Sequence, residues 1–321
     1  MSEIRGLSVI ETALDQWEWR IGLKQNGEMY VDSNLQYIIG KRETEFYKEH
    51  NVYGNAKVPF TTKEIIYEKQ DSLEVYEAYL KNFSDVCFES LQRGKGLLIA
   101  GGFCSYLPGV VGGIQRAIGL KKALGIVWID AHADIESPEE TNSNLFAGIP
   151  LAVITGLSKH LNKLRKVSGI QKSINGKNIL LSDYRAGSIS DDINLKKAEV
   201  IVLEQSAFQD AARWKEAVND LSQRVDAIFL HVDLDILDSA FVPAYKFKVA
   251  QKGETPENTI QNIHAVMQTG KVIAFSLMDV CFGDIEYGKQ ITYENAERIL
   301  SAGLGAWKDI PDFWAEIGGE K

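Results

Sequence analysis

Short, continuous apolar runs recur along the chain and alternate with longer segments of mixed polarity. Strands buried on both faces read as continuous apolar runs, and helix-length segments between such strands are typical of a parallel sheet. The pattern therefore predicts an α/β fold in which helices cover both faces of a mainly parallel sheet. The six clearest strand candidates are residues 96–102, 125–134, 178–184, 198–204, 226–238 and 271–280.

Two of the segments between these runs have clear helical features. They are residues 72–94 and residues 255–270. The second opens with Thr255 and Pro256, a good N-cap and first-turn pair, and we expect it to end at Gly270. The sequence thus predicts helices of the length needed to connect parallel strands.

The composition fits a globular protein of one domain. No linker, repeat or low-complexity block divides residues 1–321, although the pattern of residues 1–60 cannot be assigned. Apolar residues make up 45% and charged residues 25%, so an ordinary core can form. The net charge of −9 and the lack of a basic stretch argue against binding to nucleic acid or to an anionic membrane.

The spacing of the cysteines and the lengths of the apolar segments indicate in which cellular compartment the protein is found. Cys87, Cys104 and Cys281 are widely spaced, which indicates reduced thiols rather than a disulfide framework. The first twenty residues lack the apolar core of a signal peptide, and no apolar run reaches membrane-spanning length. We therefore expect a cytoplasmic protein.

Acidic residues and histidines collect at the ends of two predicted strands. If extended geometry persists there, alternation places each set on one side, at the sheet edge where ligands bind. A single aspartate is most often a turn or cap residue. Carboxylates crowded in this way, however, repel one another unless a proton or a cation neutralises them, and oxygen ligands with imidazoles suit Mn²⁺ and related ions. The two sets are Asp130, His132 and Asp134, and His231, Asp233 and Asp235.

These motifs resemble those of the ureohydrolases, the family of arginases, agmatinases and formiminoglutamases. Residues 127–152 contain D-A-H-A-D and a later G-I-P-L, and residues 229–244 contain a V-D-L-D-I-L-D segment similar to D-V-D-x-L-D-P. GGFCS (101–105) stands where the family has G-G-D-H-S, and SLMDV (276–280) where it has M-E-V-N-P. Over about residues 95–305, the resemblance implies a three-layer α/β/α sandwich with about eight strands, assembled as a trimer or hexamer.

The resemblance also implies a reaction and a ligand set. In the family, a hydroxide bridging two Mn²⁺ ions attacks a guanidine or amidine carbon and releases urea or a related amide. By this resemblance Asp130 and Asp233 bridge both ions, His132 and Asp235 complete one site, and Asp134 and Cys104 belong to the other. Asp134 is in addition a candidate catalytic residue. Asp279 is a second one, as the partner of the substrate guanidinium, although a structural salt bridge would also explain an acid there.

The sequence departs from the family pattern at four positions. Cys104 replaces a ligand histidine, which would favour Zn²⁺, Fe²⁺ or Co²⁺ over Mn²⁺ or weaken that site; a small core thiol is the alternative. Phe103 replaces a neighbouring aspartate, and Ala147 replaces a proton-shuttle histidine. Glu136 replaces an asparagine that helps to hold the amino-acid carboxylate, which a glutamate would repel. Ser143 matches a polar family position and is a candidate substrate contact.

His231 has no counterpart among the motifs and is a third candidate catalytic residue. It lies two residues before Asp233, on the same predicted side. It could be a replacement ligand, a proton carrier or a partner of a ligand, and a packed neutral imidazole is the plainer interpretation.

Three functions stay open at this point. The first is a metal-dependent hydrolase of a guanidine or amidine C–N bond, acting on a small or peptide-borne compound rather than on free L-arginine. The second is an amide hydrolase with one metal ion at the side of the site that contains His132. The third is an inactive, metal-poor relative with an interaction role, which Phe103, Cys104 and Ala147 favour.

Overall fold

Eight strands form one parallel sheet in this computed structural model, which describes residues 6–12, 14–15, 20–32, 38–39, 42–65, 73–139, 145–245, 252–280 and 287–307. The strand order is β10-β9-β8-β11-β12-β7-β1-β6, and every pairing found in it is parallel. Its strands are β1 (Leu7–Thr12), β6 (Phe60–Ile65), β7 (Gly96–Ala100), β8 (Leu124–Ile129), β9 (Ile179–Ser182), β10 (Ile201–Leu203), β11 (Ala227–Asp233) and β12 (Val272–Met278). Two short antiparallel pairs stand apart, namely β2 (Leu14–Asp15) with β5 (Ile38–Ile39) and β3 (Arg20–Leu23) with β4 (Met29–Asp32).

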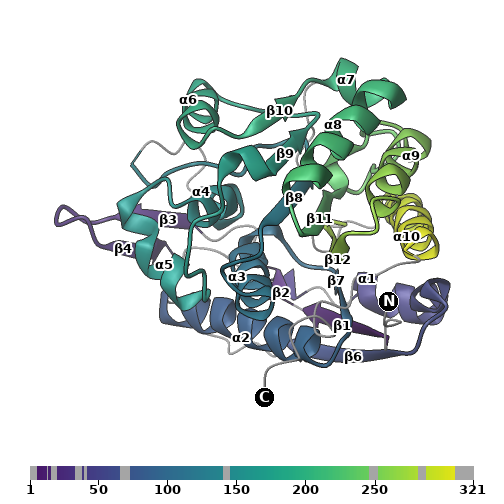
Figure 1. Cartoon of the computed structure of the whole chain (residues 1–321), viewed down its shortest axis with the longest axis horizontal. Coiled ribbons are helices and arrows are strands. Elements are labelled where there is room, and N and C mark those ends of the chain that lie inside the picture. The colour runs from purple at the N-terminus through teal and green to yellow at the C-terminus, as the bar shows by residue number, and fades with distance from the viewer. Residues whose placement is uncertain are drawn as a thin grey trace.

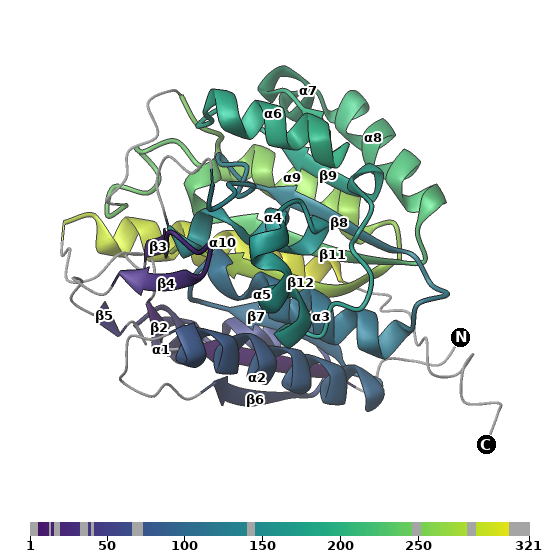
Figure 2. The same ribbon diagram turned by 90° about the vertical axis from the view of Figure 1, so that its left-hand side faces the viewer.

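Helices cover both faces of the sheet (Figures 1 and 2). One layer contains α2 (Leu73–Gln92), α3 (Leu107–Ile118), α4 (Pro150–Thr155) and α5 (Asn162–Val167). The opposite layer contains α1 (Arg42–Glu49), α8 (Ala211–Arg224), α9 (Pro256–Met267) and α10 (Lys289–Ala306). Two further helices, α6 (Ile189–Ala198) and α7 (Gln205–Gln209), lie near the β10 edge (Figure 1). The expected three-layer α/β/α architecture is confirmed.

The six strands expected from apolar runs are β7 to β12, each somewhat shorter than its run. The expected helices are α2 and α9. Thr255 caps α9, since its hydroxyl accepts a hydrogen bond from the backbone N–H of Asn258 at 3.1 Å. The helix ends at Met267, three residues before the expected Gly270, which lies in the left-handed region at φ 66°. Two strands of the sheet were not predicted. Strand β1 lies between β7 and β6, within residues 1–60, whose pattern could not be assigned, and β6 lies at the edge of the sheet.

The D-A-H-A-D residues do not lie on one side of a strand, contrary to the expectation from alternation. Strand β8 ends at Ile129, so Asp130, His132 and Asp134 lie in the loop that follows it and not on one side of an extended strand. Asp134 has a φ of 46°, which reverses the chain direction locally. The three side chains are therefore brought together by loop geometry, which strand periodicity does not describe.

The turn after β7 is closed by two glycines with positive φ values. A Cβ atom on Gly101 would lie 2.6 Å from Glu43 Oε1, and one on Gly102 would lie 2.5 Å from a methyl carbon of Thr12. The side chain of Glu43, at the start of α1, is buried against this turn and accepts a hydrogen bond from the backbone N–H of Gly102 at 3.4 Å. The turn that leads to Cys104 is therefore packed tightly against the N-terminal part of the chain.

The Glu43→Gln substitution is expected to change the pH dependence of stability. Burial, with smaller contributions from neighbouring carboxylates, raises the pKa of Glu43 from 4.5 to about 7. The folded protein then holds a proton that the unfolded chain releases, so this contribution is complete below pH 4.5 and is lost as the pH rises through about 7. Relative to wild type, the variant should gain about 3 kcal/mol in unfolding free energy across this window. Urea unfolding at several pH values measures the difference, and Glu49→Gln, at an exposed position of the same helix, controls for the lost charge.

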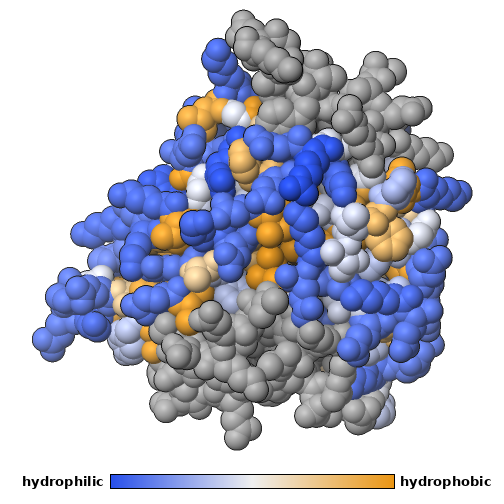
Figure 3. Space-filling model, turned by 90° about the horizontal axis from the view of Figure 1, so that it is seen from below, coloured by the Kyte–Doolittle hydropathy of each residue, from blue (hydrophilic) through white to orange (hydrophobic). Residues whose placement is uncertain are grey.

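The surface of the described part has ordinary polarity. On the face seen in Figure 3, hydrophilic side chains cover most of the described surface and apolar side chains occur in small groups. Among the described residues, we find no helix that combines the length and the apolar character needed to cross a membrane.

Candidate active site

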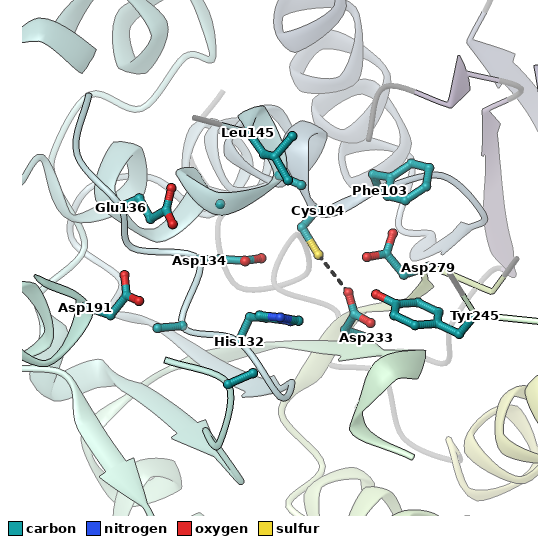
Figure 4. Close-up of a pocket in the computed structure, with 14 residues that line it drawn as sticks. Phe103, Cys104, His132, Asp134, Glu136, Leu145, Asp191, Asp233, Tyr245 and Asp279 are labelled. Atoms are coloured by element: carbon teal, nitrogen blue, oxygen red, sulfur yellow. Dashed lines mark hydrogen bonds between the residues drawn. The ribbon is translucent and has the colours of Figure 1, made fainter. Parts of the chain in front are cut away.

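A cavity of about 290 Å³ lies at the carboxyl ends of the four adjacent strands β8, β11, β12 and β7. In Figure 4 the side chains of Cys104, Asp134, Asp233 and Asp279 are turned towards one another across it. This is the sheet edge at which the sequence predicts the site. The residues that line the cavity are Phe103, Cys104, His132, Ala133, Asp134, Glu136, Leu145, Ala147, Gly148, Ala186, Asp191, Asp233, Tyr245 and Asp279.

The first group of possible metal ligands contains Asp130, His132 and Asp235, whose ligand atoms lie within 4.8 Å of one another. His132 Nδ1 lies 2.6 Å from Asp235 Oδ2 and 3.7 Å from Asp130 Oδ1. Asp235 also accepts hydrogen bonds from the backbone N–H of Ala131 and from the Tyr245 hydroxyl, both at 3.2 Å. The structure thus brings together His132 and Asp235, the two residues that the resemblance assigns to one site.

In this first group, the pKa values of His132 and Asp235 depend on each other. Burial opposes a charged imidazole, but the Asp235 and Asp130 carboxylates outweigh it and raise the pKa of His132 well above its usual value. In the same way burial opposes a charged Asp235, but the imidazolium of His132 holds the pKa of that carboxyl well below its usual range. A protonated imidazole therefore balances the charge of these carboxylates.

The second group contains Cys104, Asp130, His231 and Asp233, all buried, with ligand atoms again within 4.8 Å of one another. Cys104 Sγ lies 3.3 Å from Asp233 Oδ2 and 3.4 Å from His231 Nε2. Asp130 belongs to both groups, and Trp128 Nε1 donates to its Oδ2 at 2.9 Å. The structure therefore places His231 beside Cys104, in the group to which the sequence alone assigned Asp134.

Neither Cys104 nor His231 is charged in this environment. Burial, and then the surrounding carboxylates, raise the pKa of the Cys104 thiol well above its usual value. Burial lowers the pKa of His231 to about 3, so that its ring is neutral. A cation would reverse the shift at Cys104, because a coordinated thiol loses its proton.

Four buried carboxylates also carry more negative charge than this site can hold by itself. Burial and the nearby acids raise the pKa of Asp130 to about 6 and raise those of Asp134, Asp233 and Asp279 well above the usual range. Asp134 Oδ2 and Asp279 Oδ1 are buried and have no hydrogen-bond partner among the described residues. Unpaired buried oxygens beside an imidazole and a thiol are a donor set that fits divalent cations.

Asp279 follows β12 and faces the cavity from the side opposite to Glu136 and Asp191 (Figure 4). Its φ of 58° lies in the left-handed region, and its backbone N–H donates to the carbonyl of Gly102 at 3.0 Å, which ties it to the turn after β7. Asp279 therefore lines the cavity without belonging to either group of possible metal ligands.

The other end of the cavity is also acidic. Glu136 and Asp191 both line it (Figure 4), and the backbone N–H of Glu136 donates to the Gly148 carbonyl at 2.8 Å. Asp191 Oδ2 accepts from the backbone and hydroxyl of Ser188 as the cap of α6, whereas its buried Oδ1 has no hydrogen-bond partner in the described structure. The sequence did not identify Asp191, because a Ser-x-x-Asp segment indicates only a helix start. Ser143 lies outside the described residues.

Comparison with known proteins places this geometry in a family. The model of the family described as "Arginase family" matches residues 29–301. The chain belongs to the arginase family. The arginase of Entamoeba histolytica is 23% identical over 252 residues, which are 77% of this chain and 81% of that one.

Solved structures of this family share the fold. The arginase of Entamoeba histolytica in complex with L-ornithine is similar with a TM-score of 0.79 and 20% identity, covering 94% of this chain and 99% of that chain. The formimidoylglutamase of Bacillus subtilis is similar with a TM-score of 0.71 and 14% identity, covering 97% and 89%. The ureohydrolase resemblance is thus confirmed, and membership supports an enzyme of the ureohydrolase kind.

The cavity wall beside the possible metal ligands is apolar at two positions where the sequence departs from the family motifs. Phe103 and Ala147 both line the cavity, and Leu145 lies beside Ala147. An alanine cannot carry a proton, so any proton transfer in this protein must use another group of the cavity.

A buried ion pair supports the loop that contains Asp235. Arg185 Nη1 lies 2.6 Å from Asp183 Oδ2, and Arg185 Nη2 donates to the carbonyls of Asp235 and Ile236 at 2.9 and 3.0 Å. Both side chains are almost fully buried, and burial raises the pKa of Asp183 to about 7 in spite of the neighbouring Arg185 guanidinium. Arg185 is therefore a positioning residue for the ligand loop, and no motif in the sequence identified it.

Replacing Arg185 with glutamine is expected to destabilise the protein by about 3 kcal/mol or more, because it leaves Asp183 buried without its partner. The loop carbonyls of Asp235 and Ile236 also lose their donors. Urea denaturation measures the change. As a control, Arg298→Gln breaks an exposed ion pair with Glu257 and should cost less than about 1 kcal/mol. Similar costs for both variants would contradict a supporting role for Arg185.

Proposed function

We propose that this protein is a metal-dependent hydrolase of a C–N bond in a cationic guanidine or amidine, and that free L-arginine is not its substrate. The observation that carries this proposal is the arrangement of the cavity. Two adjoining groups of metal-ligating side chains share Asp130, and the free carboxylate oxygen of Asp279 belongs to the same cavity. Such an arrangement suits a reaction that needs both a metal ion and a bound cation.

Asp130, His132, Asp233 and Asp235 would hold the metal, with Cys104 or Asp134 beside them. Mn²⁺ suits so oxygen-rich a set, and Zn²⁺, Fe²⁺ or Co²⁺ become better candidates where the thiol takes part. When bound, the metal would supply a water activated near neutral pH and would stabilise the charge that develops as the C–N bond breaks.

The residues of the cavity would orient the substrate and move the proton. A guanidinium or amidinium placed across the cavity can donate N–H groups to Asp279 Oδ1, which has no partner among the described residues. Asp134 Oδ2 is likewise unpaired and turned to the same space, so it can accept the proton of the attacking water and pass it to the leaving nitrogen. This role would replace the histidine that is missing at Ala147.

Glu136 and Asp191 support a substrate without a free carboxylate. Both line the end of the cavity away from Asp279 (Figure 4), where they would repel an amino-acid carboxylate and attract a second positive charge. An agmatine-like amine or a peptide-borne arginine has this charge pattern.

The proposal is tested by assaying the full chain, reconstituted separately with Mn²⁺, Fe²⁺, Co²⁺ and Zn²⁺, against guanidino, amidino and formimino compounds. We expect release of urea, ammonia or formamide, a higher kcat/KM for carboxylate-free compounds than for free arginine, and loss of turnover in Asp279→Asn. No product with any metal, or a clear preference for free arginine, would overturn the proposal.

One observation favours an alternative with a single metal ion. The Asp130–His132–Asp235 group is complete without Cys104, whose thiol instead donates to Asp233. A protein using this group alone would suit amide hydrolysis, the second of the functions that the sequence leaves open. Elemental analysis decides between them, since about two ions per chain would exclude this alternative.

A further inference from the structure

We propose that the second metal site of this protein is a mixed site in which the Cys104 thiolate and the His231 imidazole bind the ion together with Asp130 and Asp233, and that it selects Zn²⁺ or Co²⁺ over Mn²⁺. The imidazole that the G-G-D-H-S segment of the family provides after β7 is here provided by β11. The site is thus rebuilt with a histidine from another strand, and not simply weakened by the loss of one.

The distances fit one tetrahedral ion. With bonds of about 2.0–2.3 Å, the ligand atoms of such an ion lie about 3–4 Å apart. Cys104 Sγ is 3.4 Å from His231 Nε2 and 3.3 Å from Asp233 Oδ2, and the four ligand atoms all lie within 4.8 Å of one another. Small side-chain shifts therefore suffice to close the four donors around an ion.

The surroundings of His231 are those of a metal-binding histidine. Its Nδ1 lies 2.9 Å from the hydroxyl of Ser276, the residue opposite it on β12. When Nδ1 donates to that hydroxyl, the lone pair of Nε2 faces Cys104, which is how an outer partner fixes the tautomer of a ligand. The ring of Trp128, opposite His231 on β8, packs against the imidazole with ring centroids 4.2 Å apart and holds it in place.

A second, independent observation points to a cation here. Asp134 is nine-tenths buried, its Oδ2 has no hydrogen-bond partner among the described residues, and its carboxylate is turned towards Cys104 (Figure 4). Leaving such an oxygen unpaired is costly, because a buried acceptor without a donor loses its hydration and gains nothing in return. The charge of an ion held by the four donors would offset the repulsion between the carboxylates of Asp134 and Asp233 and would stabilise the unpaired oxygen without binding it.

The chemistry of the donors sets the metal preference. Binding forms an Sγ–metal bond and releases the thiol proton to solvent, which makes Cys104 a soft anionic ligand. Soft thiolate ligands favour Zn²⁺ and disfavour Mn²⁺, which binds most weakly among the first-row divalent ions. The group around His132 contains no sulfur ligand and therefore has no such preference for Zn²⁺ over Mn²⁺. The two sites of one chain should thus differ in the metal that they select.

Co²⁺ is the probe for this site, because a thiolate bound to Co²⁺ gives a charge-transfer band in the near ultraviolet. We expect the full chain titrated with Co²⁺ to develop this band at one equivalent. Cys104→Ser should lose the band, whereas Cys87→Ser, a buried thiol in the core of α2, should keep it. A band that persists in Cys104→Ser, or two bound Co²⁺ ions without any band, would overturn the proposal.

The role of His231 is tested by affinity. His231→Gln removes a ligand and should keep the band but weaken the binding of Co²⁺ at this site by more than about 100-fold. Ser276→Ala removes only an outer partner and should weaken this binding less, by roughly 10–100-fold. Unchanged affinity in His231→Gln would show that His231 is not a ligand.

In case a variant does not fold, X-ray absorption of the wild-type protein with Zn²⁺ serves as the second measurement. It should show a Zn–S distance of about 2.3 Å, and a shell of oxygen and nitrogen only would overturn the proposal.

This inference rests on the proposed function only for the presence of metal. The charge-transfer band and the affinity for Co²⁺ are measured without substrate. The proposed metal site and the proposed hydrolase activity can therefore fail independently. A charge-transfer band in a protein that turns over none of the compounds would support the site and contradict the hydrolase, whereas turnover with Mn²⁺ and no sulfur–metal contact would do the reverse.

Discussion

In the Asp235→Asn variant we expect turnover to fall by at least about 100-fold and the metal content to fall with it. Asp235 combines three contacts, to His132 Nδ1, to the Ala131 N–H and to the Tyr245 hydroxyl, and it is almost fully buried. Loss even of an outer partner of a metal ligand costs roughly 10–100-fold, so the loss of a charged ligand should reach or exceed the upper value. Elemental analysis and an assay with excess metal measure both effects.

The same variant should also be less stable without metal. The neutral carboxamide of an asparagine cannot balance the His132 imidazolium, and breaking a fully buried pair costs about 3–5 kcal/mol. The imidazole of His132 is 40% exposed to the cavity, so water screens its charge and we expect about 1–2 kcal/mol. Asp220→Asn, at an exposed position of α8, makes the same charge change far from the site. Full turnover in Asp235→Asn would show that the first ligand group is not used.

The six strands β7 to β12 could be predicted because almost all of them are buried on both faces. Such strands must be apolar at nearly every position, and their sequences show it directly. Strand β6 is the opposite case. It pairs on one side only, four of its six residues are exposed, and its sequence FTTKEI carries no apolar run. Strand β6 was therefore missed for a physical reason, since its exposed positions are under weaker burial constraints.

The residue pattern predicted pairs of residues that lie on one strand, whereas contacts between residues of different strands were either implied only by the family resemblance, as for His132 with Asp235, or missed. Asp233 and His231 share a side of β11, as alternation requires. The contact between His231 and Cys104 depends on the order β11-β12-β7, in which β12 separates the two strands. Strand order is not encoded in the pattern of any single strand. Asp191 was missed in the same way, because nothing in its segment shows that the start of α6 lies beside Glu136.

Removing the two outer acids is expected to change which substrate the protein prefers. In the Glu136→Gln, Asp191→Asn double variant, kcat/KM for free arginine relative to a carboxylate-free guanidine such as agmatine should rise about 10–100-fold. Two like charges about 7 Å apart repel by roughly 2 kcal/mol at an effective dielectric constant of about 20, and a tenfold ratio corresponds to about 1.4 kcal/mol. Both acids line the cavity, and Asp191 Oδ1 is buried with no hydrogen-bond partner in the described structure, so its charge is poorly screened.

Three comparisons separate electrostatic repulsion from a change in shape. The single variants should each give part of the shift, and Asp191→Asn should retain the cap of α6, because its carboxamide oxygen can still accept from Ser188. Glu139→Gln makes the same charge change at an exposed position near Ser158 and should leave the ratio unchanged. Added salt should narrow the wild-type preference but have little effect in the double variant, since only repulsion between charges is screened. A ratio that stays constant in the double variant would mean that the cavity rejects arginine by shape, and Glu136 and Asp191 would then have no part in selecting the substrate.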